Sequence, residues 1–294
     1  MNVDVVNKIK RLAIIALASD DELMEALVLK GGNAIDLAYS PYHDLISRTS
    51  YDLDYSIEDG DFNEAEIDIS KRIERSLIQT YAENDYIILD YKFLSKPKVV
   101  LKEVADFWGG YKAEFKVIEK KVYDQHNGDI EKVRRTAIPL NPNSSPVFEL
   151  EFSKFEYVGQ KEKVDVDGFK VYVYTPEMIV FEKLRAICQQ LPLYSEIIPS
   201  FSPRARARDF YDIHLIMELH NINPVTDENI KLIENIFHAK KVPLDFIKEI
   251  RNNKARHKDN WQDVKDTISP YEQLEGFDFY FNYVLEKFEK ITFP

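Results

Sequence analysis

Two aspartates one residue apart, Asp52 and Asp54, are the first side chains in the sequence that could do chemistry. They lie in the stretch RTSYDLDYS, where they alternate with Tyr51, Leu53 and Tyr55. Side chains in a strand point to opposite faces in turn, so both carboxylates are expected on one face. Aspartate is disfavoured in strands, and like charges on one face repel each other. The pattern therefore predicts a nearby cation, either a metal ion or a neighbouring Arg or Lys, unless water alone solvates the pair.

A glycine pair precedes the aspartates in the stretch LKGGNAI, residues 29 to 35. Gly31 and Gly32 stand between an apolar run and a helical pattern, where backbone N–H groups and a helix N-terminus can bind phosphate. Asn33 can cap that helix. The alternative is an ordinary strand-to-helix turn in which glycine supplies a positive φ. A phosphate-binding turn followed by a carboxylate pair favours Mg²⁺, which prefers oxygen ligands and bridges substrate phosphates.

Three further stretches carry charged side chains that could belong to the same site. In FELEFS, Glu149 and Glu151 share a strand face, and the alternative to a third metal-site carboxylate is an exposed face of the sheet. Lys183 borders an apolar helical stripe in PEMIVFEKLRA, and such a lysine either extends to solvent or contacts a phosphate. In RARARDFYDI, Asp209 and Asp212 share a helical face, either as functional acids or as part of a surface ion-pair cluster.

The composition limits the class of protein. The chain has 294 residues, of which 45% are hydrophobic and 31% charged, an ordinary balance for a folded protein of about two domains. A single cysteine excludes an intramolecular disulfide and a cysteine-based zinc site. No segment reaches the roughly 18 apolar residues of a membrane span, and the N-terminus lacks a convincing secretion signal. We therefore expect a cytoplasmic protein.

Charge is unevenly distributed along the chain. The net charge of −12 argues against broad, non-specific nucleic-acid binding, which needs a positive field. However, SPRARARDF carries three arginines within five residues, and KEIRNNKARHK, residues 248 to 258, carries five Lys or Arg and one acid. A local basic groove therefore remains compatible with the sequence.

The elements that must position these residues fall into two parts. Strands are predicted in ALVLKGG (26–32), where an apolar run enters a tight turn, and at 86–94, 112–123, 147–155 and 168–175, around the Asp52/Asp54 strand. Helices are predicted at 3–18, in DELMEAL (21–27), and at 33–40 and 62–83. At Thr175, a good N-cap, and Pro176, suited to the first helical position, the pattern changes from mixed strands and helices to helices alone. Helices follow at 176–190, 204–220, 226–238, 243–252 and 270–290. We therefore predict an α+β fold of two domains, a mixed domain at 1–175 and an all-helical domain at 176–294.

Four motifs, in this order, resemble the AbiEii-type nucleotidyltransferase toxins of abortive-infection and type IV toxin–antitoxin systems. They are LKGGNAI, RTSYDLDYS, EKLRA and RARDFYDI, and they span residues 27 to 216. The resemblance implies a polymerase-β-like nucleotidyltransferase domain, with a small mixed sheet flanked by helices. One position departs from the family pattern, because the glycine motif often continues with a hydroxyl residue where this chain has Asn33.

The resemblance also implies roles for individual residues. Those assigned to the nucleotide are Lys30, Gly31, Gly32, Asn33, Arg48, Ser50 and Lys183. Asp52 and Asp54 are assigned to Mg²⁺, and Glu151 is added as a third metal ligand from its strand position alone. Lys183 and either Asp209 or Asp212 complete the catalytic set with the two metal-binding aspartates.

The activity that the resemblance implies is Mg²⁺-dependent transfer of a nucleoside monophosphate from an NTP onto an acceptor hydroxyl. The expected acceptor is RNA, at a tRNA 3′ end, and the enzyme is expected to be the toxin of a toxin–antitoxin or phage-defence system with a cognate antitoxin. Two alternatives stay open. One is a nucleotide-binding regulatory protein without transferase activity, and the other is a transferase that acts on a protein hydroxyl.

Overall fold

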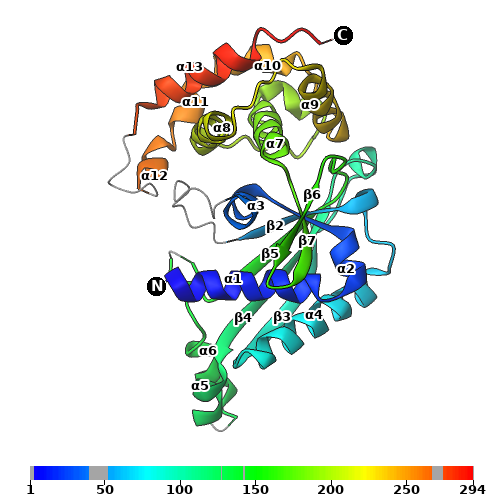
Figure 1. The fold of residues 1–294 in the computed structure, drawn as a ribbon, viewed down its shortest axis with the longest axis vertical. Helices are drawn as coiled ribbons and strands as arrows, with labels where there is room; N and C mark the ends of the chain where they lie inside the picture. The colour runs from blue at the N-terminus through cyan, green and yellow to red at the C-terminus, as the bar shows by residue number, and fades with distance from the viewer. Residues whose placement is uncertain (1–2, 40–51, 127, 142, 267–273, 294) are drawn as a thin grey trace. The chain divides into compact units, whose positions relative to one another are not determined.

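The computed structural model describes residues 3–39, 52–126, 128–141, 143–266 and 274–293 (Figure 1). These residues form two compact units. The first contains the described residues up to Val173 except Lys102–Phe107, and the second contains that short segment and the chain from Tyr174 onward. Among the described helices, none is long and apolar enough to cross a membrane.

The first unit is built on a seven-stranded mixed sheet with the order β3–β4–β5–β2–β1–β7–β6. Two neighbouring pairs are parallel, β2 with β5 and β1 with β7, and the others are antiparallel. The strand that follows Asp52 therefore lies in the middle of the sheet. The strands are β1 (Leu27–Lys30), β2 (Leu53–Ile57), β3 (Tyr86–Lys96), β4 (Gly110–Glu119), β5 (Phe148–Ser153), β6 (Glu162–Val166) and β7 (Phe169–Val173).

Two long helices, α1 (Val3–Ala18) and α4 (Glu66–Glu83), pack against each other and cover one face of this sheet (Figure 1). The buried ring of Tyr81 in α4 meets Phe115 of β4 edge-on, with 5.8 Å between the ring centroids. Its hydroxyl donates a hydrogen bond of 2.7 Å to the carbonyl of Ile9 in α1. Tyr81 therefore joins both helices and the sheet at one point. The shorter helices of this unit are α2 (Asp21–Ala26), α3 (Gly31–Ala38), α5 (Lys120–Gln125) and α6 (Ile130–Arg135).

The strands bury one set of side chains beneath the helices and present the other set on the opposite face. In β5, Phe148, Leu150 and Phe152 are buried, whereas Glu149 and Glu151 keep part of their surface exposed. At the start of β2, Leu53 and Tyr55 are likewise buried and Asp54 between them is part-exposed, whereas Ser56 and Ile57 at its end are both buried. Because the side-chain period of a strand is two, the charged residues of these strands share one face.

The second unit is helical. Thr175 caps its first helix by accepting a 3.3 Å hydrogen bond from the N–H of Met178, and Pro176 occupies the first helical position. Its core holds aromatic rings, among them Phe210, which lies 5.3 Å from Phe281 between centroids. The helices are α7 (Pro176–Cys188), α8 (Ala207–His220), α9 (Asp227–Ala239), α10 (Phe246–Glu249), α11 (Lys254–Lys258), α12 (Trp261–Lys265) and α13 (Phe277–Phe288).

The predicted α+β class is confirmed, and most predicted elements are present with shifted ends. The helix predicted at 62–83 begins at Glu66, and the strand predicted at 112–123 ends at Glu119, where α5 begins. The helix predicted at 243–252 is wrong as a single element, because α10 gives way to a 3₁₀ turn at Ile250–Asn253. Asn252 and Asn253 are weak helix formers, which accounts for the interruption. The β6 strand and the α6 helix were not predicted.

Replacing Tyr81 by Phe tests the joint between α1, α4 and the sheet. The ring remains and the hydrogen bond to Ile9 is lost, so we expect the free energy of unfolding to fall by about 0.5–1.5 kcal/mol. Urea denaturation followed by circular dichroism measures the change. Tyr123→Phe, at a half-exposed position of α5, is the matched control, and an equal effect of both substitutions would contradict the assignment.

Candidate active site

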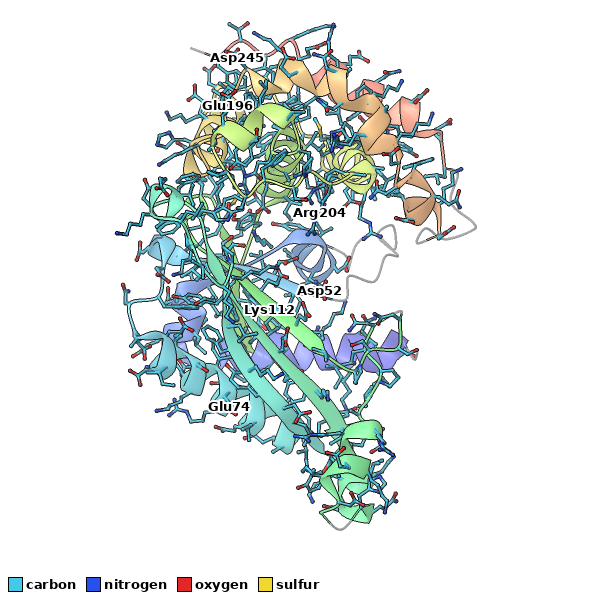
Figure 2. The ribbon with its side chains drawn as sticks, turned by 180° about the vertical axis from the view of Figure 1, so that it is seen from behind. Asp52, Glu74, Lys112, Glu196, Arg204 and Asp245 are labelled. Carbon is cyan, nitrogen blue, oxygen red and sulfur yellow. The ribbon has the colours of Figure 1, made fainter. Side chains whose placement is uncertain are left out.

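Side chains from four neighbouring strands form one register row on the charged face of the sheet. Lys30 of β1 pairs with Asp54 of β2, Asp54 with Glu151 of β5, and Glu151 with Lys112 of β4. Two carboxylates in the middle of the row are thus flanked by a lysine at either end. Asp52 comes one residue before β2, and it interacts electrostatically with Lys112; Figure 2 labels both residues.

The carboxyl group of Asp52 has a pKa that is raised above its ordinary value. Desolvation is the largest cause, although the residue as a whole is exposed, and the carboxylates of Glu149 and Glu151 raise the pKa further. Lys96 and Lys112 act in the opposite direction. The carboxylates at this end of the sheet therefore repel one another, and a bound cation would relieve that repulsion.

The two glutamates of β5 have lysine partners. Glu151 forms an ion pair with Lys96, and Glu149 lies 3.3 Å from the Nζ of Lys112, which also pairs with Glu114 at 2.5 Å. The sequence predicted a cation near the aspartates, either a metal ion or a neighbouring Arg or Lys. Lysines are present at this end of the sheet, and the ion pairs described here join them to glutamates.

The donors at the aspartate pair have the chemistry that Mg²⁺ prefers, because carboxylate oxygens are its usual protein ligands. However, no group of three or more His, Cys, Asp or Glu side chains arranged for a metal ion occurs within the described part of the chain. A site with two protein carboxylates, completed by substrate oxygens, is compatible with this finding. The role of Glu151 as a third ligand stays a prediction.

The glycine turn places a helix N-terminus beside Asp54. Gly31 is the first residue of α3 and has a φ of +69°, a conformation that side chains rarely adopt. A Cβ atom added there would lie 3.4 Å from Oδ2 of Asp54. The first N–H groups of a helix lack partners within the helix and carry the positive end of its dipole. The start of a helix and a carboxylate of the aspartate pair are therefore immediate neighbours.

Asn33 connects this turn to Asp52. Its side chain is buried, accepts a hydrogen bond of 3.1 Å from Nζ of Lys10 in α1, and donates one of 2.6 Å to the carbonyl of Asp52. Burial lowers the pKa of Lys10, and the negative charge of Asp36 opposes that effect. Asn33 thus holds the backbone from which the Asp52 side chain projects. The phosphate contact of Asn33 stays a prediction.

Lys10 was not singled out in the sequence, although a signal for it existed. In the N-terminal helix it follows Val6 by four residues and precedes Ala13 by three, so it lies on the buried apolar stripe. A lysine on such a stripe either extends to solvent or finds a buried partner. Here it finds the amide of Asn33.

Three further residues assigned to the nucleotide are placed as follows. The buried side chain of Lys30 lies 3.7 Å from an oxygen of Glu156, so its ammonium group has an acidic partner within the first unit. Arg48 and Ser50 lie outside the described residues.

In the second unit, the structure brings together the three residues predicted there. Nζ of Lys183 in α7 lies 3.0 Å from Oδ1 of Asp209 and 2.7 Å from Oδ2 of Asp212, both in α8. The side chains of the three residues are 17%, 9% and 16% exposed, so the alternative in which Lys183 extends into solvent is wrong. Arg206 adds a second cation to Asp209 at 3.3 Å. The prediction that both aspartates share a helical face is confirmed, because one ammonium group bridges them.

The chain belongs to the family described as nucleotidyl transferase AbiEii toxins of type IV toxin–antitoxin systems, whose family model matches residues 14–283. The resemblance seen in the four motifs is thereby confirmed, and the protein is a nucleotidyltransferase. Among curated proteins, no match to the chain was found.

Comparison with solved structures gave the following similar chains. JHP933 from Helicobacter pylori is 18% identical, with 97% of this chain and 92% of that chain covered and a TM-score of 0.45. A candidate nucleotidyltransferase from H. pylori is 17% identical, with 97% and 95% covered and a TM-score of 0.47. An antigenic nucleotidyltransferase-like protein from Paracoccidioides brasiliensis is 15% identical, with 79% and 93% covered and a TM-score of 0.33.

Replacing Lys183 by Ala is expected to destabilise the second unit as well as to affect activity. Asp209 and Asp212 would remain close together and mostly buried without their shared ammonium group, at a cost of about 2–4 kcal/mol. Trp261 lies in this unit and Trp108 in the first, so Trp261 fluorescence during urea unfolding, measured in a Trp108→Phe background, reports the change. Lys265→Ala, at an exposed position, is the control, and unchanged stability of Lys183→Ala would refute the structural role of the ion pairs.

Replacing Asp52 by Asn is expected to stabilise the protein at neutral pH by a few tenths of a kcal/mol, because it removes one of several repelling carboxylates at an exposed position. The pKa of Asp52 is higher in the folded state than in the unfolded state, so the folded protein binds this proton more tightly. The destabilisation is therefore present above the folded pKa and disappears as the pH falls through it. Urea unfolding of both proteins at pH 7 and at successively lower pH should show a shrinking difference. A difference that stays constant with pH would argue against this origin.

Proposed function

We propose that this nucleotidyltransferase moves a nucleoside monophosphate from an NTP onto a hydroxyl of RNA, at a tRNA 3′ end, with Mg²⁺ as cofactor. The observation that carries the proposal is the contact between the glycine turn and the aspartate pair, where a Cβ on Gly31 would come within 3.4 Å of Oδ2 of Asp54. A phosphate bound by the helix N-terminus would thus lie next to carboxylates that can share a metal ion with it.

The backbone of the glycine turn is assigned to the triphosphate. Gly31 and Gly32 lack side chains, so a phosphate can approach the N–H groups at the start of α3 closely. Lys30, the residue before the turn, would add positive charge near the same phosphates. Its pairing with Glu156 also means that this charge is held in place.

Asp52 and Asp54 are assigned to Mg²⁺, which when bound would neutralise phosphate charge and polarise the phosphoryl group. The chain's own contribution is to orient these two carboxylates. Asp54 is fixed by the pairing of β2 with β1 and β5, and Asp52 by the hydrogen bond from Asn33 to its carbonyl. Desolvation and, after it, the charges of Glu149 and Glu151 raise the pKa of Asp52, and a bound divalent cation would stabilise the charged form of this carboxyl group.

The assignment of Lys183, Asp209 and Asp212 rests on the family motifs and on their ion pairs. The two aspartates fix the position of the ammonium group, so that little side-chain entropy would be lost when it contacts a phosphate. Such a fixed cation can stabilise the charge that develops on the transferred phosphoryl group.

The biological setting follows from the family. Membership of a type IV toxin–antitoxin family implies a cognate antitoxin, and we propose that the transfer onto RNA is the growth-inhibiting reaction that the antitoxin opposes. The protein would thus act as the toxin of a toxin–antitoxin or phage-defence system.

Incubation of the purified protein with labelled NTPs, Mg²⁺ and total RNA tests the proposal. Wild-type protein is expected to label RNA, and Asp54→Asn to reduce the rate at least about 10²-fold, because a metal ligand and preorganised charge are lost. Asp59→Asn is the matched control, since it removes an aspartate of the same unit at a φ of 57° that Asn tolerates. Omission of Mg²⁺ should also abolish labelling.

The same experiment separates the two alternatives. A nucleotide-binding regulatory protein would bind NTP equally well with Asp54→Asn and would label nothing. A protein-directed transferase would label a ribonuclease-treated lysate and leave purified RNA unlabelled. Either result would contradict the proposal of an RNA acceptor.

A further inference from the structure

Two basic stretches that lie about 50 residues apart in the chain are joined in the second unit by one side chain. The amide of Asn260 accepts a 3.1 Å hydrogen bond from the N–H of Ala207 and donates one of 3.4 Å to the carbonyl of Ala205. These alanines alternate with the arginines of the segment that leads into α8. Asn260 itself follows α11 by two residues. The arginine-rich segment and α11 are therefore held side by side.

His257 shows independently that the two stretches are neighbours. Its buried ring in α11 packs against Phe210 of α8, with 5.2 Å between centroids. Burial lowers its pKa to about 4; the charge of Asp209 opposes that shift, and those of Arg206 and Arg256 add to it. One cation from each stretch thus lies close enough to act on the same imidazole.

The cations of this surface outnumber the acids that pair with them. We define the basic patch as Arg204, Arg206, Arg208, Lys254, Arg256 and Lys258. Lys254 and Lys258 share Asp278, at 3.2 and 3.4 Å, and Arg206 shares Asp209 with Lys183.

Two arginines of the patch are left to bind a ligand. Arg204 is exposed, and Figure 2 labels it, while Arg256 is half-buried. Within the described part of the chain, no acidic side chain forms an ion pair with either of them. Guanidinium groups bind phosphate oxygens in a bidentate geometry, which suits this pair to a polyanion.

We propose that the basic patch binds the phosphate backbone of the RNA acceptor. The inference rests on the proposed function in taking RNA as the acceptor, and it adds the surface that holds it. On a chain with a net charge of −12, a polyanion is attracted where cations locally exceed acids, as they do at this patch. Because the contacts are to phosphates, the patch contributes affinity for RNA without selecting a base sequence.

The double variant Arg204→Gln/Arg256→Gln tests the patch, with fluorescently labelled bulk tRNA as the probe. We expect RNA affinity to fall roughly tenfold or more, and the slope of log K against log salt concentration to decrease by about 2, since two phosphate contacts are lost. NTP affinity should not change. Fluorescence anisotropy at several salt concentrations measures RNA binding, and thermal unfolding checks that the variant is folded.

Lys231→Gln/Lys290→Gln is the matched control, because it removes two charges from exposed positions of the same unit. Equal loss of RNA affinity in both double variants would overturn the patch and indicate a general charge effect. Unchanged affinity of the arginine variant, or no tRNA binding by the wild type, would overturn it as well.

Transfer assays separate this inference from the proposed function. If the wild type labels RNA and the arginine variant does so with unchanged KM for RNA, the patch is refuted and the proposed function stands. If the wild type labels no RNA but binds tRNA through the two arginines, the RNA transferase activity is refuted and the patch stands. A raised KM for RNA with an unchanged kcat supports both.

Discussion

Repulsion among carboxylates on one face of the sheet is the constraint around which the first unit is organised. Asp52, Glu149 and Glu151 raise the local negative potential, and Asp54 pairs with Glu151 across neighbouring strands. Such a cluster lowers stability, and proteins keep it where function needs the charge. The apolar face of the same strands offsets the cost, because Leu53 and Tyr55 of β2 and Phe148, Leu150 and Phe152 of β5 are buried.

The glycine turn places positive potential next to these carboxylates. Gly31 allows the backbone to come close to Asp54 because it has no Cβ and adopts a positive φ. The start of α3 then presents N–H groups and the positive end of a helix dipole next to the negative cluster. Backbone geometry thus holds positive and negative potential a few ångströms apart. A ligand that combines a phosphate with a metal ion suits this arrangement, because the phosphate is attracted to the start of α3 and the metal ion to the carboxylates.

The sequence predicts the local parts of this site well because they depend on local patterns. Alternation identified β5, and the glycine pair located the turn into α3. The β7 strand was predicted, but β6 and the hairpin that joins them were missed, although the turn Asp167-Gly168 is a strong hairpin signal with a positive φ at both residues. The helix predicted at 243–252 failed for a different reason, since two asparagines outweighed the apolar periodicity.

The contacts between residues far apart in the sequence could not be predicted, because they depend on which distant elements pack together in the folded chain. The parallel pairing of β2 with β5 places Glu151 opposite Asp54 across almost a hundred residues of sequence, and no local pattern specifies it. The hydrogen bond between Lys10 and Asn33 also joins residues that are distant in the sequence, and so do the two ion pairs of Lys183. Side-chain type predicted which residues carry charge, but only tertiary structure shows which partner each charge has.

Asparagine has the same physical role in each of the two units. Asn33 holds the backbone at Asp52, and Asn260 holds the backbone of the arginine-rich segment at Ala205 and Ala207. Ion pairs also fix charged groups in this chain, as Glu156 does for Lys30 and Asp209 does for Lys183, but each ion pair offsets the charge that it fixes. An amide offers one donor group and one acceptor group without net charge, so it orders the backbone and leaves the field intact. In each unit an uncharged side chain therefore orders a stretch of backbone that carries charged residues and leaves their charge unchanged.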